Sequence, residues 1–183
     1  MSGLGLLTTA HSNFSKISFR FPTDEDICDL AENLRRSDIE ELAAVCDFSP
    51  AEAVLLSVRA SDAAFLRAWH ADGRLLCIAG CSPQALNLAA PWLLATPLLD
   101  RYGKCLMREA RAEVRMMLAR YETLRNVIDV RQVATLKWLR ALGFELTEGL
   151  EIKPGLPVVR FERRREIAWS DALRCRSAHP TIF

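Results

Sequence analysis

The sequence predicts one α/β domain in which a mixed central sheet is flanked by helices, with an extended arm at each end. Its 183 residues, 50% of them hydrophobic and 26% charged, suit a single globular domain and leave little material for a second. Helical periodicity fills much of the stretch from 23 to 58. In the second half, short apolar runs alternate with helical ones, a pattern typical of helices packed on the faces of a sheet.

The first elements are a strand and three helices. Residues 17–21 alternate weakly and end at Pro22, which predicts a short strand. Thr23 is a natural N-cap for a helix over 23–34, because three acidic residues fill its first turn. Ser37 with Glu40 forms a capping-box pattern that opens a second helix, and Ser49-Pro50 opens a third.

A hairpin follows, with its bend at Asp72-Gly73, and then a polar loop. The remaining predicted elements are, in chain order, a strand at 91–96, a helix at 103–121, a strand at 126–130, a helix at 133–142 stopped by Gly143, and two strands near 150 and at 158–162. The predicted boundaries are an arm at 1–16, the domain at 17–162 and an Arg-rich arm at 163–183.

Charge and cysteine usage exclude several classes of protein. Twenty-four basic and 23 acidic residues give a net charge of +1, so the protein has no large overall positive charge that would attract nucleic acid. No run of 18 apolar residues predicts a membrane span, and the first residues lack the features of a secretory signal. The six cysteines form no CxxC pair, so we expect no metal site, and reduced thiols suit folding in the cytoplasm.

Six segments of the chain resemble a known group of proteins. They are ENLRRSD at 32–38, SPAEAVLLS at 49–57, PWLLAT at 91–96, the segment 106–131, LKWLRALGF at 136–144 and GLPVVRFE at 155–162. In this order they resemble the GNAT-like proteins of short-tailed bacteriophages (podoviruses) that are related to an internal virion protein. The wider resemblance is to the GNAT fold of acyl-CoA-dependent N-acyltransferases.

The resemblance implies a place for coenzyme A. Active GNAT enzymes carry a Q/R-x-x-G-x-G/A loop whose backbone N–H groups and helix N-terminus hold the pyrophosphate. Arg101, Gly103 and Lys104 are the matching candidates, but Leu106 stands where glycine or alanine is expected. We therefore expect no cofactor in the main hypothesis, and acetyl-CoA in the enzymatic alternative.

Catalytic residues stay unassigned. The resemblance implies an acid, often a tyrosine after the penultimate strand, yet the chain has only Tyr102 and Tyr121. Glu148 and Glu151 are acidic candidates for a base, and His70, beside the hairpin bend, is expected at the surface.

The Arg-rich arm is predicted to bind a partner, since arginine and aromatic residues are typical interface anchors. The candidate residues are Arg163, Arg164, Arg165, Trp169, Arg174 and Phe183.

The main hypothesis is a non-catalytic virion protein, internal or at the head-to-tail region, that binds head, portal or tail components and could form homo-oligomers. It would pass through the host cytoplasm during assembly, with weak DNA contact as a further option. The alternative is an acyl-CoA-dependent N-acetyltransferase acting on a host or phage protein, and a third reading is an inhibitor of a host factor.

Overall fold

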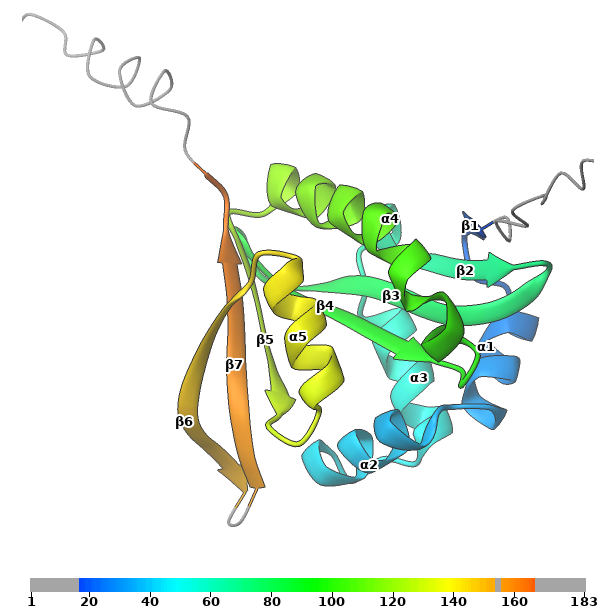
Figure 1. Ribbon diagram of the computed structural model, residues 1–183, viewed down its shortest axis with the longest axis horizontal. Coiled ribbons are helices and arrows are strands. Elements are labelled where there is room, and N and C mark those ends of the chain that lie inside the picture. Colours follow the sequence, from blue (N-terminus) through cyan, green and yellow to red (C-terminus); the bar gives the residue numbers. More distant parts are fainter. Residues whose placement is uncertain (1–16, 154–155, 167–183) are drawn as a thin grey trace, which may run out of the picture.

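The computed structural model describes residues 17–153 and 156–166, and it contains one seven-stranded sheet with helices on both faces (Figure 1). The strand order is β1-β2-β3-β4-β5-β7-β6. All neighbouring strands are antiparallel except β4 and β5. The predicted fold class is therefore confirmed.

The elements follow the predicted order. They are β1 (Ile17–Arg20), α1 (Asp24–Glu32), α2 (Arg36–Val45), α3 (Pro50–Arg59), a 3-10 turn (Ala63–Phe65), β2 (Arg67–Ala71), β3 (Arg74–Ala85), β4 (Leu88–Ala95), α4 (Leu99–Arg120), β5 (Thr123–Asp129), α5 (Val133–Ala141), β6 (Glu145–Lys153) and β7 (Leu156–Arg164).

Two of the three predicted helix caps are confirmed. Thr23 and Ser49 each close a complete capping box, with Asp26 and Glu52 respectively. The predicted cap at Ser37 is wrong, because α2 begins at Arg36 and has no side-chain cap. Tertiary contacts hold this helix start instead: the backbone N–H before it, at Arg35, donates to the Ala95 carbonyl at 2.8 Å.

The polar segment after the first hairpin is a second hairpin, not a loop. Strand β3 continues to Ala85 and pairs antiparallel with β4, which begins at Leu88, three residues before the predicted start. Ser82 pairs with Ala90 in this extension. Strand pairing across the sheet overrides the local composition here, as is usual for β structure.

The helices cover opposite faces of the sheet. In Figure 1, α4 and α5 lie in front of the sheet and α3 behind it. Leu30 of α1 and Val54 of α3 pack with Ile78 of β3, whereas Val114 of α4 and Leu139 of α5 pack in a second cluster. Successive strand residues point to opposite faces, so β3 supplies Ile78 to the first cluster and Cys81 to the second.

One interruption of the sheet positions the candidate site. The parallel strands β4 and β5 pair only at Leu88 with Thr123 and at Ala89 with Leu124, and Figure 1 shows them diverging from there. The Asn126 amide spans the opening and donates to the Pro91 carbonyl at 3.1 Å. Backbone groups that would pair in a continuous sheet are thus left facing a gap.

Candidate functional site

A cavity of about 490 Å³ occupies the opening between β4 and β5. Most residues that line it are apolar, and they come from both strands and from α2, α4 and α5. Trp92 and Leu93 are successive residues of β4, which point to opposite faces of the sheet, and both line the cavity. The cavity therefore passes through the sheet, so that two ligands could approach each other from opposite faces.

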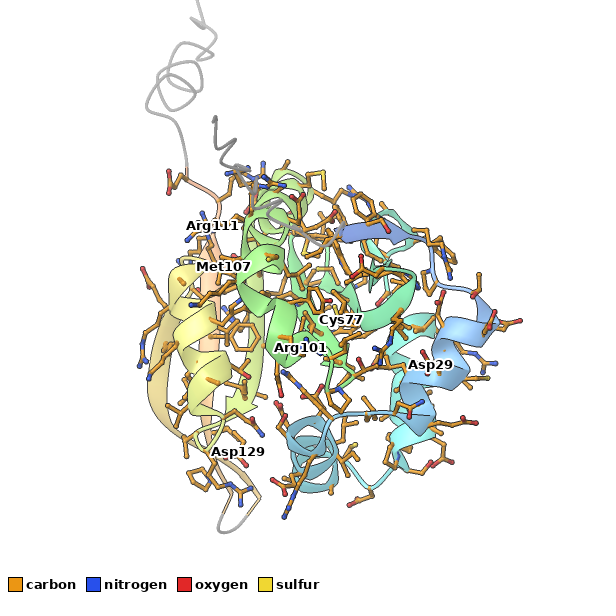
Figure 2. The ribbon with its side chains drawn as sticks, turned by 45° about the vertical axis from the view of Figure 1, so that its right-hand side comes forward. Asp29, Cys77, Arg101, Met107, Arg111 and Asp129 are labelled. Carbon is orange, nitrogen blue, oxygen red and sulfur yellow. The ribbon has the colours of Figure 1, made fainter. Side chains whose placement is uncertain are left out.

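The beginning of α4 differs from the sequence prediction. Arg101 was expected in a loop before a helix starting at Gly103, with Gly103 and Lys104 in the first turn of that helix, but α4 begins at Leu99 and contains all three. Figure 2 shows Arg101 near the start of this helix, with Met107 and Arg111 further along it. The loop prediction is wrong because the inward apolar positions continue back from Leu106 to Leu99 at helical spacing.

The first turn of α4 is not free to bind an anion with its backbone. The N–H groups of Leu99, Asp100 and Arg101 each donate to a carbonyl three residues earlier, at 3.1, 3.3 and 3.2 Å. These are the N–H groups that a helix usually leaves without a partner in the helix. The backbone cradle that the family resemblance implies is therefore absent from this turn.

Gly103 lies within helix α4, where the lack of a side chain leaves open space beside the backbone. It has an ordinary helical backbone, and a Cβ atom built on it would meet no atom within 4 Å. The residue lines the cavity. A side chain at this position would therefore extend into open space beside the cavity.

Glu41, on α2, is the titratable residue of the cavity with the most useful chemistry. Burial raises the pKa of Glu41 to about 7, the negative charge of Asp38 adds to this rise, and Arg35 opposes it. A carboxylate whose pKa lies near neutral pH is well suited to act as a general base. No local sequence motif includes Glu41, so the sequence alone does not mark it as a candidate.

Polar contacts hold α2 against both sides of the opening. The Asp38 carboxylate accepts from the Ala95 N–H at the end of β4, at 2.8 Å, and from Arg35 Nε at 2.7 Å. On the other side, the Gln132 amide donates to the Ser37 carbonyl at 3.0 Å. Glu41 is thus carried on a helix that is fixed to the end of β4 and to the turn before α5.

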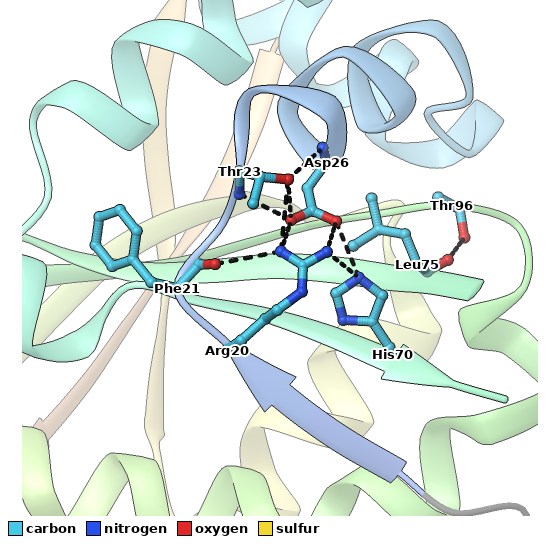
Figure 3. Close-up of polar contacts among 7 residues, drawn as sticks. All are labelled: Arg20, Phe21, Thr23, Asp26, His70, Leu75 and Thr96. Atoms are coloured by element: carbon cyan, nitrogen blue, oxygen red, sulfur yellow. Dashed lines mark hydrogen bonds and ion pairs between the residues drawn. The ribbon is translucent and has the colours of Figure 1, made fainter. Parts of the chain in front are cut away.

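His70 is buried, in contrast to the surface position expected for it. It is 8% exposed, and its Nε2 lies 2.9 Å from Oδ1 of Asp26 (Figure 3). Burial alone would raise the pKa of Asp26, but hydrogen bonds from the Thr23 N–H, Arg20 and His70 outweigh it and lower the pKa to about 2. This network joins β1, α1 and β2, and none of its members lines the cavity.

The described arginines of the predicted arm contact the domain itself. Arg163 and Arg164 are the last residues of β7. Arg163 donates to the Leu142 carbonyl, Arg164 pairs with Glu162, and Arg165 Nε donates to the Leu118 carbonyl at 2.7 Å.

Other predictions for the chain ends lie outside the described residues. These are the arm at 1–16 and the partner-binding candidates Trp169, Arg174 and Phe183. The side chains of Glu148 and Glu151 also lie outside what is described. Within the described part, no group of three or more His, Cys, Asp or Glu side chains could hold a metal ion, and no helix is long and apolar enough to span a membrane.

Solved structures share this fold. A GNAT-family acetyltransferase from Bacillus anthracis matches with a TM-score of 0.63 and 10% identity, covering 82% of this chain and 96% of its own. The ribosomal-protein-alanine N-acetyltransferase from Brucella melitensis matches with 0.58 and 12%, covering 81% and 99%. The aminoglycoside acetyltransferase AAC(6')-Ib, in complex with coenzyme A, matches with 0.58 and 20%, covering 88% and 99%.

The chain therefore has the GNAT fold, and identities this low establish the fold alone. No protein-family model matches the sequence, and no curated protein sequence matches it either.

Proposed function

We propose that the protein is an acyl-CoA-dependent N-acyltransferase that transfers an acetyl group to an amine. The observation that carries this proposal is the cavity that passes through the sheet between β4 and β5 with Glu41 in its wall. The fold agrees with it, since structural neighbours are acetyltransferases, one of them bound to coenzyme A.

The residues that line the cavity fit the thioester-bearing arm of coenzyme A better than the residues at the start of α4 fit its diphosphate. The apolar cavity, with the edge of β4 that no strand covers beyond Ala89, suits the thioester-bearing arm, which is long, narrow and able to hydrogen-bond with a strand. The diphosphate finds no backbone cradle at α4, so the exposed side chains of Arg101 and Lys104 would hold it. When bound, the cofactor supplies the activated acyl group.

Glu41 would accept the proton that the acceptor amine must lose to become a nucleophile. Neither tyrosine lines the cavity. Tyr121 donates to Asp62 at 2.8 Å, and burial first, with the Asp62 contact, raises the pKa of Tyr121 to about 12. We therefore assign no tyrosine as the acid.

Release of free thiol from acetyl-CoA, measured over a panel of amines and N-terminal peptides, tests the proposal. We expect release that depends on both substrates and that falls about 100-fold or more in Glu41→Gln. Glu40→Gln is the matched control, because Glu40 is the preceding residue and its exposed side chain pairs with Arg36. Absence of amine-dependent release from every acceptor, or equal rates in the two variants, would contradict the assignment.

A second candidate is the non-catalytic virion protein, internal or at the head-to-tail region, that binds other virion proteins. The observation that favours it is the first turn of α4, whose N–H groups are already occupied. Mass spectrometry of purified, fractionated particles tests this function. Recovery in fixed proportion to the head and tail proteins would support it, and absence from the particles would exclude it.

A further inference from the structure

A second, smaller cavity lies at the C-terminal end of α5. Its volume is about 200 Å³, and it is lined by Arg111 and Arg115 of α4, Arg163 of β7, and residues 141–143 at the end of α5. We propose that this arginine pocket binds a phosphate group, at a place separate from the cavity between β4 and β5.

The structure holds two of these guanidinium groups in place. Arg111 Nη2 donates to the Ala141 carbonyl at 3.3 Å, and Arg163 Nη1 donates to the Leu142 carbonyl. A Cβ atom at Gly143 would lie 3.2 Å from the Arg163 guanidinium, so glycine permits this close approach as well as the positive φ of +83° that ends α5. Each group uses one N–H in these bonds, and a guanidinium carries five.

The pocket has no negative side chain to balance its charge. No Asp or Glu lines it, and within the described residues none of its three arginines forms an ion pair. Other arginines nearby do have carboxylate partners: Arg108 pairs with Glu109, and Arg164 with Glu162. The partial negative charge at the end of α5 offsets only a fraction of three positive charges. A bound anion would supply the remainder.

Phosphate is the anion that this geometry suits. Guanidinium groups present donors in a planar fork that matches two phosphate oxygens at once, and such bonds are among the stronger hydrogen bonds in proteins. The phosphate could be free, part of a nucleotide or carried on a serine side chain.

The arginine pocket is distinct from the proposed cofactor grip. Arg111 lies ten residues beyond Arg101, about 15 Å along the helix axis. Arg101 and Lys104 do not line the pocket, and none of the arginine-pocket residues except Leu142 lines the larger cavity.

Titration calorimetry of the full chain with inorganic phosphate tests the proposal, and adenosine monophosphate and O-phosphoserine in parallel arms distinguish the sources. We expect saturable binding that Arg115→Gln weakens about tenfold or more. Arg115 makes no hydrogen bond within the described residues, so the thermal midpoint should stay unchanged. Arg108→Gln, an exposed and ion-paired neighbour, should bind phosphate as the unaltered protein does.

Three results would overturn the proposal. The first is no saturable binding of any of the three probes. The second is equal weakening in Arg108→Gln and Arg115→Gln, which would indicate only general attraction to a basic surface. The third is weaker acetyl-CoA binding in Arg115→Gln, which would make the pocket part of the cofactor site. Phosphate binding in a protein that fails to bind acetyl-CoA would leave this proposal standing while the proposed enzymatic function fails.

Discussion

Two carboxylates in this protein are shifted in opposite directions by their surroundings. Asp26 accepts hydrogen bonds from a backbone N–H, an arginine and a histidine, and its pKa falls to about 2 despite its burial. Glu41 is partly buried beside another carboxylate, and its pKa rises to about 7. The hydrogen bonds to Asp26 stabilise the fold, and the surroundings of Glu41 place a group at the cavity that can accept a proton near neutral pH.

Glu41 should cost the protein stability at high pH. Because its folded pKa lies above the usual 4.5, the folded state binds its proton more tightly, and stability falls as the pH rises from about 4.5 to about 7. Glu41→Gln should therefore raise the free energy of unfolding at pH 8 by about 2 kcal/mol, and by little at pH 4. Urea denaturation at both pH values measures this, and an equal effect at the two would disprove the shift.

The same residue should set the pH dependence of the reaction. If Glu41 is the base, kcat/KM rises as the pH increases through about 7 and Glu41 loses its proton. The acid limb of the pH profile should disappear from the residual activity of Glu41→Gln, and should persist in Glu40→Gln. An unchanged limb in Glu41→Gln would assign it to another group.

Asp26 should stabilise the protein at neutral pH. Since its folded pKa lies below the usual 3.8, its contribution is present above about pH 4 and is lost as the pH falls towards 2. Asp26→Asn should lower the free energy of unfolding at pH 7 by about 2 kcal/mol, because Arg20 and His70 lose a charged partner. Denaturation curves at pH 7 and pH 2.5 check this, and a variant as stable as the original at pH 7 would contradict it.

At the scale of the elements, local capping residues explain why the starts of α1 and α3 were predicted correctly. Thr23 and Ser49 cap their helices through residues three positions away, so the sequence contains the whole interaction. The start of α2 and the extent of β3 could not be predicted in this way. Arg35 bonds to Ala95, and Ser82 pairs with Ala90, so both features depend on chain segments brought together by folding.

Helix α4 offers a test of its revised beginning. If Gly103 lies inside the helix with open space at its Cβ, Gly103→Ala should raise the free energy of unfolding by about 0.5–1 kcal/mol. A glycine required by a loop would give the opposite sign. Thermal denaturation of the two proteins distinguishes these outcomes.

At the scale of the whole molecule, the site is a product of topology. The segments that resemble GNAT proteins and the element order predicted the fold, which the structure confirms. The cavity could not be read from any segment, because it arises where β4 and β5 stop pairing after Ala89 and Leu124. Glu41 lines the cavity because α2 packs against this opening, a contact between segments that no local motif encodes.

The central claim is that this opening binds an acyl-CoA, and titration calorimetry with acetyl-CoA tests it most directly. We predict saturable binding to the full chain, weakened about tenfold or more in Gly103→Leu, whose side chain would extend from the cavity wall. No binding at millimolar acetyl-CoA, or unchanged affinity in Gly103→Leu, would contradict the claim.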